Sequence, residues 1–480
     1  MPHCARYRGV RQSMSYSIST RRSACLTFAL TALVATSAPI ADEVTRLPSE
    51  ALAGGTTMTV ADTGKDAYLH YAAVLDQRQL KLVAEGRQFF ETKWAFYWFE
   101  QGLWGRGPTS NAESCAACHA NKGRGAPPAG NEPAMSMIVR LSLPGEGAHG
   151  APKPLPDYGD QLQTFGIPRF IPPEGQVHVR WREQEIALAD GEVVVLRMPD
   201  VSISDLSYGA LGEGVMTSAR VAPPLVGVGL LDAVADETIL ALAARQALAG
   251  IRGHPNYVWD VTAQRRVLGR FGLKANHPNL RQQIAAAFIG DIGLSTSLFP
   301  EQNCPGVQQA CREMMFAGKP EITDYRLETV DAYVRFAAVP AWRNADDPEV
   351  KRGEQLFAQA RCAVCHVPEL TTSVGAPLAA MAQLTIHPYT DLLLHDMGEA
   401  LADHRPDFEA GGRDWRTAPL WGSGLSATVN GNANLLHDGR ARNVTEAILW
   451  HGGEATVSRD AFREMPAQDR AALVQFVQSL

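Results

Sequence analysis

Apolar residues recur at helical spacing over much of the chain. The clearest case is a helix predicted to begin near Pro466, which places Leu473, Phe476 and Val477 on one face. Other helices are predicted from about residue 83, over 235–249, 281–289 and 323–338, from Pro348, and from a capping box at Asn443 and Glu446 to about His451.

Strand-like alternation is strongest in one stretch. Apolar and polar residues alternate over 176–200, and Asp190 and Gly191 separate two apolar runs, which predicts a β-hairpin. A loop rich in proline and glycine precedes it, up to about residue 160. We therefore expect a mainly α fold whose first part carries a large, partly β insertion.

Two short motifs carry the candidate chemistry. They are Cys115-Ala-Ala-Cys118-His119, the first motif, and Cys362-Ala-Val-Cys365-His366, the second motif. Each reads Cys-x-x-Cys-His, the attachment signature of a c-type haem. Two cysteines three residues apart lie on one face of a helical turn, where their thiols can add to the two haem vinyl groups. The adjoining histidine can bind the haem iron as its fifth ligand.

Three alternatives explain the two motifs less well. A zinc ribbon needs cysteine pairs separated by roughly 15–20 residues, whereas positions 115 and 362 are far more distant. Chance alone gives on the order of 0.004 copies of this motif from the composition, so two accidental copies are very unlikely, and a thioredoxin-like redox pair is the remaining alternative. The motifs therefore predict two covalently bound c-type haems.

Both motifs follow a similar lead-in. Gly86 and Phe90 precede the first motif on a predicted helix, and Gly353 and Phe357 precede the second. A glycine, two helical turns and then the motif are typical of the opening of a cytochrome c domain. This weak repeat predicts two tandem cytochrome c-type haem domains. The predicted organisation is an export signal at 1–41, an N-terminal domain with the insertion at 42–340, and a C-terminal domain at 341–480.

The first 41 residues have the features of a signal peptide. Arg21 and Arg22 form a positive region, 25–38 is a short apolar run, and small residues up to Ala41 offer a cleavage site. An amphipathic N-terminal helix is the alternative. We expect export to the bacterial periplasm. No later apolar run reaches the roughly 18 residues of a membrane span, so no stable membrane insertion is expected.

Composition adds two points. The 480-residue chain has a formal net charge of −7, and it is more acidic without the arginines of the leader, which disfavours nucleic acid as a partner. Cys304 and Cys311 belong neither to the leader nor to the motifs. In an oxidising compartment we expect them to form a disulfide, with two free thiols as the alternative.

Further motifs resemble the bacterial di-haem cytochrome c peroxidase superfamily. They are Leu394-His395-Asp396-Met397-Gly398, Asp414-Trp415-Arg416-Thr417-Ala418-Pro419-Leu420, and Leu436-His437-Asp438-Gly439-Arg440 followed by Glu446-Ala447-Ile448. Segments 218–234 and 269–275 narrow the resemblance to a branch of di-haem oxidoreductases that is peroxidase-like or thiol oxidoreductase-like. The resemblance covers about residues 80–480.

In this superfamily the C-terminal haem stores electrons and has two axial ligands. The resemblance places the sixth ligand five residues beyond Glu446, at His451, where relatives have methionine or tyrosine. Two histidine ligands give a lower potential than histidine with methionine. The alternative is a histidine that only interacts with the dipole of its helix.

The N-terminal haem of the superfamily, held here by His119, is the one that binds peroxide. Cleavage of the O–O bond requires an open iron position and a nearby group that moves a proton. Relatives use a glutamine and a glutamate, and the resemblance assigns these roles to Gln163 and Glu174. The alternative is that both are surface residues of a loop.

The superfamily also holds a calcium ion just before the His-Asp-Gly motif. Asn432 and Asn434 occupy this place and offer oxygen ligands, although the Thr-x-Pro form of relatives is absent. His395 and His437 are expected to be structural or to contact haem propionates. Three tryptophans are expected to pack in the core or to relay electrons: Trp181, Trp415 and Trp450.

The resemblance implies an exported di-haem oxidoreductase of peroxidase type. Electrons would enter at the second haem from a small periplasmic cytochrome or cupredoxin, and hydrogen peroxide or a related oxidant would react at the first. Two alternatives remain open: a di-haem electron-transfer cytochrome without peroxidase activity, and a protein-modifying di-haem oxidase. A hydrolase is disfavoured because the sequence has no Gly-x-Ser-x-Gly elbow.

Overall fold

The computed structural model describes residues 47–97, 99–130, 132–314 and 318–480. The predicted export signal lies outside these residues. The described residues belong to one compact unit, Ile40–Leu480. Within this described part, no helix combines the length and the apolar character that a membrane crossing requires.

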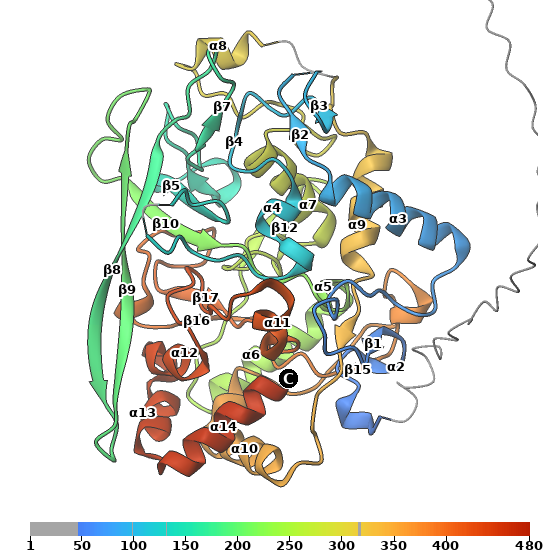
Figure 1. Ribbon diagram of the computed structural model, residues 1–480, viewed down its shortest axis with the longest axis vertical. Helices are drawn as coiled ribbons and strands as arrows, with labels where there is room; N and C mark the ends of the chain where they lie inside the picture. The colour runs from blue at the N-terminus through green and yellow to red at the C-terminus, as the bar shows by residue number, and fades with distance from the viewer. Residues whose placement is uncertain (1–46, 98, 131, 315–317) are drawn as a thin grey trace, which may run out of the picture. The chain divides into compact units, whose positions relative to one another are not determined.

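Helices and strands are interspersed throughout the unit (Figure 1). The chain is 33% helical and 20% strand, and the strands form seven two-stranded sheets and one three-stranded sheet among the described residues. The prediction of a mainly α fold with two tandem cytochrome c-type domains is therefore wrong, because the fold is mixed α/β. Most strands are only two to four residues long, and several pair with distant segments. Such strands leave no alternation that the sequence could show.

The predicted helices are present within a few residues of their expected bounds, because their ends carry local signals. Asp76 caps α3 (Gln77–Glu91) in a capping box with Gln79, and Asp347 caps α10 (Pro348–Gln359), which has proline at its first position. The other α-helices are α2 (Gly55–Met58), α4 (Cys115–Cys118), α5 (Val228–Asp232), α6 (Asp236–Leu248), α7 (Leu280–Ala287), α8 (Gln309–Arg312), α9 (Asp324–Arg335), α11 (Ser426–Asn430), α12 (Val444–Trp450), α13 (Thr456–Glu464) and α14 (Ala467–Ser479).

The sheets connect neighbouring and distant parts of the chain. The pairs are β1 (Thr59–Val60) with β13 (Val339–Pro340), β2 (Trp94–Ala95) with β3 (Leu103–Trp104), β4 (Thr109–Ser110) with β7 (Phe165–Gly166), β8 (Gln176–Ala187) with β9 (Val193–Ser204), β11 (Tyr257–Asp260) with β12 (Arg265–Leu268), β14 (Leu370–Thr371) with β15 (Thr385–Ile386), and β16 (Leu394–Asp396) with β17 (Asp414–Arg416). The three-stranded sheet has β5 (Met137–Glu146) between β10 (Met216–Val221) and β6 (Pro152–Lys153).

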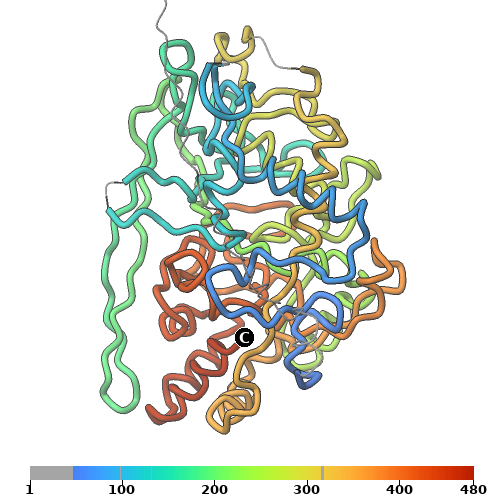
Figure 2. The backbone as a smooth tube through the Cα atoms, turned by 45° about the vertical axis from the view of Figure 1, so that its right-hand side comes forward, coloured from blue at the N-terminus to red at the C-terminus, as the bar shows by residue number. Residues whose placement is uncertain are grey.

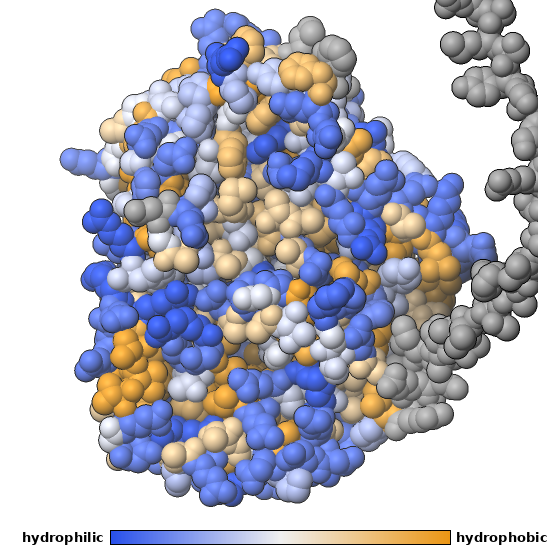
Figure 3. Space-filling model, viewed as in Figure 1, coloured by the Kyte–Doolittle hydropathy of each residue, from blue (hydrophilic) through white to orange (hydrophobic). Residues whose placement is uncertain are grey.

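The predicted hairpin is confirmed and is the longest strand pair described. β8 and β9 are antiparallel strands of 12 residues each, and they extend past α12 and α13 (Figure 1 and Figure 2). Val177 and Val179 belong to one apolar core cluster, whereas Leu188 and Leu196 belong to another. The face drawn in Figure 3 is mostly hydrophilic, with hydrophobic side chains gathered over the lower part of the hairpin.

The glycines of the repeated lead-in have a packing role. A Cβ on Gly86 of α3 would lie 1.9 Å from the carbonyl oxygen of Thr329 on α9. A Cβ on Gly353 of α10 would lie 2.1 Å from that of Ala472 on α14. Only glycine permits these two close helix crossings. The repeat in the sequence therefore reflects two similar helix pairs, one beside each motif.

The predicted disulfide between Cys304 and Cys311 is confirmed. We expect the double replacement of both cysteines by alanine to lower the free energy of unfolding by about 2–3 kcal/mol, because a bridge across a loop this short restricts the unfolded chain to that extent. Denaturant unfolding of the holoprotein and the double variant measures this difference. Equal stability would contradict the prediction.

Candidate active site

Both motifs line one cavity of about 480 Å³. Their four cysteines are free thiols. Apolar side chains from both core clusters, such as Phe90, Ile284 and Phe357, make up much of the remaining wall. The structure thus brings together two motifs that are far apart in the sequence, at a cavity suited to a large apolar ligand.

The first motif forms a short helix against one core. The Ser114 hydroxyl accepts a hydrogen bond from the backbone N–H of Ala117 at 3.1 Å and caps α4, which holds Cys115 and Cys118 one turn apart. His119 follows this turn, and burial lowers its pKa to about 4. Backbone groups of Pro223 and Gly123 oppose this shift in pKa. The imidazole is therefore neutral and has a nitrogen free to bind a metal.

The second motif is held more firmly. Arg361, with a φ of 64°, begins the 3-10 turn Cys362–Val364. The Nδ1 atom of His366 lies 2.9 Å from the carbonyl oxygen of Tyr389. A hydrogen bond of this kind keeps the proton on Nδ1 and leaves Nε2 as the ligand atom.

His451 faces His366 across the cavity. Their ring centres are 6.5 Å apart, and the rings are inclined by 47°. A metal–imidazole bond of about 2.0–2.1 Å, added to roughly 1.1 Å from nitrogen to ring centre, puts two opposed imidazole ligands about 6.3 Å apart. Nδ1 of His451 lies 2.7 Å from the carbonyl oxygen of Ala447, which again leaves Nε2 free. The pair therefore has the spacing needed to bind one metal ion from both sides.

No such partner faces His119 in the part of the chain that the structure describes. Among the described residues, its only ring contact is with Phe90, at 6.4 Å between ring centres. The second motif thus has a candidate ligand opposite its histidine, as a closed metal position requires. The first motif has none in the described residues, as an open position requires. The difference arises because α12 delivers His451 to the second motif alone.

Three polar side chains of the cavity wall have buried atoms without a hydrogen bond to any described residue: Asn276 Oδ1, His277 Nδ1 and Gln283 Oε1. Burial lowers the pKa of His277 to about 4, so the imidazole is neutral and can accept a proton. His277 was not among the candidates from the sequence. The one signal was its place two residues after the branch motif that ends at Ala275, and three residues before α7 begins at Leu280.

Gln163 and Glu174 lie close together but do not line this cavity. Both are fully buried, not surface residues. The Gln163 backbone N–H donates to Glu174 Oε2 at 2.7 Å, and the Gln163 amide donates to the carbonyl oxygen of Gly290 at 3.0 Å. Burial raises the pKa of Glu174 to about 8. Their catalytic role stays a prediction.

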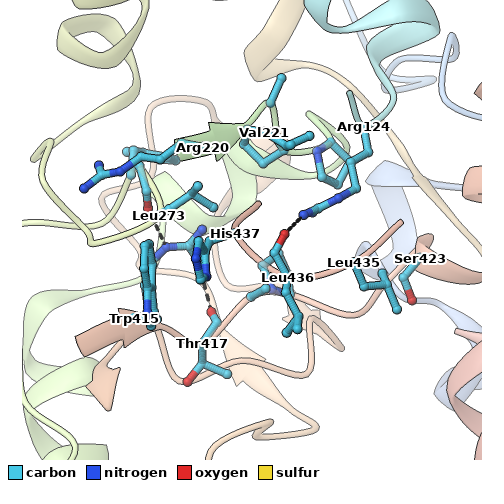
Figure 4. Close-up of a pocket in the computed structure, with 18 of the residues that line it drawn as sticks. Arg124, Arg220, Val221, Leu273, Trp415, Thr417, Ser423, Leu435, Leu436 and His437 are labelled. Carbon is cyan, nitrogen blue, oxygen red and sulfur yellow. Dashed lines mark hydrogen bonds between the residues drawn. The ribbon is translucent and has the colours of Figure 1, made fainter. Parts of the chain in front are cut away.

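Two arginines of the cavity wall, Arg124 and Arg416, make no ion pair with a carboxylate of the described residues. Burial lowers the pKa of each to about 10. The Arg124 guanidinium donates to the carbonyl oxygen of Leu436 (Figure 4). Asp438 and Asp391 offset the burial of these cations only in part, and a buried cation that is not fully compensated is costly. These two residues therefore favour an anionic group in the cavity.

His437 and Trp415 stack at the wall of the cavity (Figure 4). Their ring centres are 3.7 Å apart and the rings are nearly parallel, at 6°. The Nζ atom of Lys274 lies 4.6 Å from the centre of the Trp415 ring. Trp181 and Trp450 do not line the cavity. The stack is a packing contact that holds one side of the cavity.

His395 lies beside the second motif, with Nδ1 3.6 Å from the sulfur of Cys365. Its nitrogens also bond Asp391 at 2.9 Å and Glu454 at 2.8 Å. Burial alone would lower its pKa, but hydrogen bonds to Asp391, Cys365 and Glu454 raise it to about 12. Cys365, Asp391 and His395 lie close enough to bind a metal, but the sulfur belongs to the second motif. His395 therefore positions the motif.

Asn432 and Asn434, the predicted calcium ligands, lie in the loop between α11 and α12. Asn432 Oδ1 accepts a hydrogen bond from the Asn434 backbone N–H at 3.3 Å, and Asn434 Oδ1 accepts one from Arg197 at 2.7 Å. Both side-chain oxygens therefore already have partners in the protein.

Comparisons with known proteins bear on this site. No curated protein matches the chain. Among solved structures, a hydrazine synthase chain from Kuenenia stuttgartiensis, pressurized with 20 bar xenon, is 14% identical, with a TM-score of 0.35 over 98% of this chain and 100% of that chain. This likeness is too weak to support a conclusion. A family model described as "Di-haem oxidoreductase, putative peroxidase" matches residues 48–480, nearly the whole described chain. The chain therefore belongs to the di-haem oxidoreductase family and is a haem-dependent oxidoreductase.

Proposed function

We propose that this enzyme reduces hydrogen peroxide or a related oxidant, with a haem bound covalently at each motif. The observation that carries the proposal is the asymmetry of the two motifs. His366 has a second imidazole opposite it at 6.5 Å between ring centres, whereas His119 has no facing imidazole among the described residues. One position suits electron storage, and the other suits a reacting ligand.

The residues of the cavity fit two c-type haems. The four free cysteines can form the thioether bonds, and His119 and His366 can each offer a ring nitrogen. The apolar wall suits a porphyrin, and Arg124 and Arg416 suit its propionates. When bound, the haems supply iron that cycles between ferric and ferrous states and that can bind peroxide at an open coordination position.

The second motif is proposed as the electron-storing site. His366 and His451 would bind from opposite sides, each with its Nδ1 held by a backbone carbonyl group. These hydrogen bonds fix both rings before any ligand binds, so little reorganisation accompanies a change of charge. A small periplasmic donor, a cytochrome or a cupredoxin, would supply the electrons.

The first motif is proposed as the peroxide site. Reduction of hydrogen peroxide to two waters consumes two electrons and two protons, so a proton-moving group must lie at this position. We assign that role to His277, because it lines the cavity and its Nδ1 has no partner among the described residues. Asn276 and Gln283 line the same wall and can orient the oxidant. The Gln163–Glu174 pair remains the alternative suggested by the resemblance.

Spectroscopy of the purified, exported protein tests the proposal. We expect mass spectrometry to show two covalent haem additions, and we expect EPR to show one low-spin and one high-spin ferric species. Hydrogen peroxide should change the high-spin species first, because only an open position can bind it. Two low-spin species whose EPR signals do not change with peroxide would instead indicate an electron-transfer cytochrome. Fewer than two attached haems would contradict the assignment of the motifs.

A further inference from the structure

The superfamily resemblance predicts a bound calcium ion at Asn432 and Asn434, at the start of the segment 432–440. Calcium takes six to eight oxygen ligands, often including carboxylates. In this protein several oxygens of the segment have other partners. Asp438 is the one acidic residue in 432–440, and its carboxylate pairs with the guanidinium of Arg440 at 2.7 Å. The residues present do not fit a calcium site.

A guanidinium group from another part of the chain lies at this segment. Arg197 of β9 donates through Nη2 to Asn434 Oδ1 at 2.7 Å and to the carbonyl oxygen of Gly439 at 2.9 Å. Its Nε donates to the carbonyl oxygen of Arg440 at 3.0 Å. Three oxygens that a metal cation could use thus accept hydrogen bonds from one planar guanidinium group. Their arrangement matches the forked donor geometry of arginine.

Other contacts hold this guanidinium in place. Its carbon atom lies 4.1 Å from the centre of the Trp181 ring on β8, which is the distance of a cation–π contact. Burial and the nearby Arg442 lower the pKa of Arg197, while Glu446 and Asp438 oppose this. An arginine keeps its charge under such shifts.

Two further oxygens of the segment also have donors within the protein. The carbonyl oxygen of Leu436 accepts from Arg124, and Asn432 Oδ1 accepts from the backbone N–H of Asn434. One nearby buried oxygen, Asn430 Oδ1, has no partner among the described residues. This one free side-chain oxygen is far from the six to eight oxygen ligands that calcium takes.

We propose that the guanidinium group of Arg197 is the structural cation of segment 432–440 and takes the place that calcium has in related enzymes. The inference concerns the architecture and does not depend on the proposed peroxide chemistry. It also gives the hairpin a role at the active site. The segment carries His437, whose ring stacks on Trp415 at the cavity wall, so Arg197 positions that wall from β9.

The first test uses the wild-type holoprotein. Metal analysis after dialysis against excess calcium, and thermal unfolding followed at the haem absorption band with and without the chelator EGTA, measure any requirement for calcium. We expect no stoichiometric calcium and the same unfolding midpoint in both conditions. One bound calcium ion, or a midpoint that falls with EGTA and recovers with added calcium, would overturn the proposal.

The second test compares two arginines of the same hairpin. Arg197→Gln removes the charge and the forked donors, and should lower the unfolding midpoint by about 3–6 °C. Arg182→Gln is the matched control, because Arg182 is exposed on β8, and its midpoint should stay unchanged. Arg197→Met retains the apolar stem over Trp181 and should be destabilised like Arg197→Gln. Full stability of both Arg197 variants would also overturn the proposal.

Discussion

Replacement of His451 by glycine is expected to convert the low-spin ferric signal of the second motif into a high-spin signal. The imidazole of His451 faces His366 at 6.5 Å between ring centres, the separation that two ligands of one iron require. Glycine removes this nitrogen and leaves an open position. EPR of the ferric holoprotein should then show two high-spin species in place of one.

Methionine at the same position tests the identity of the ligand. His451→Met keeps a ligand but replaces nitrogen by a thioether, which favours ferrous iron, so the reduction potential should rise. Redox titration measures the change. His404→Gly is the matched control, because the side chain of His404 is 67% exposed. An unchanged low-spin signal in both His451 variants would show that the ligand lies elsewhere.

Replacement of His277 by glutamine is expected to slow the reaction with hydrogen peroxide by about 10²- to 10⁴-fold, the contribution of a positioned proton-transfer group. Glutamine keeps hydrogen-bonding atoms but has no basic ring nitrogen that can accept a proton from the bound oxidant. Stopped-flow measurement of the second-order rate constant with peroxide detects the loss. The resting ferric spectrum should stay the same, because His277 is not proposed as a ligand.

Glu174→Gln separates the two candidates for proton transfer. Its rate constant should remain close to that of the wild type, because Glu174 is fully buried and does not line the cavity. His178→Gln, an exposed position on β8, is the control for a distant histidine. If Glu174→Gln loses activity and His277→Gln retains it, the Gln163–Glu174 pair is the proton-moving group.

Local signals predicted the helices well, because caps and apolar spacing act within a few residues. Asp347 and Pro348 mark the beginning of α10, and Asn443 marks that of α12. The fold class was predicted wrongly, because the decisive contacts are distant ones. Met137 pairs with Val221 between β5 and β10, and no local sequence pattern in either strand indicates which distant strand it pairs with.

The candidate site shows the same difference between local signals, which the sequence reveals, and distant contacts, which it does not. The Cys-x-x-Cys-His motifs were visible because haem attachment requires a fixed local spacing. The approach of His451 to His366 was expected only through the family resemblance. His277 and Arg197 had no motif of their own, since a lone histidine before a helix and a lone arginine in a strand are common features of protein surfaces. Their surroundings became apparent only in three dimensions.

The β8–β9 hairpin bears on how the protein loses its structure. Val177 and Val179 lie in one core cluster and Leu196 in another, on a single pair of hydrogen-bonded strands. Chains of this length commonly divide into domains that unfold separately. Here, local unfolding around either core cluster must also distort β8 and β9, which the other cluster keeps in place. The hairpin therefore couples the opening free energies of the two clusters and makes their unfolding cooperative.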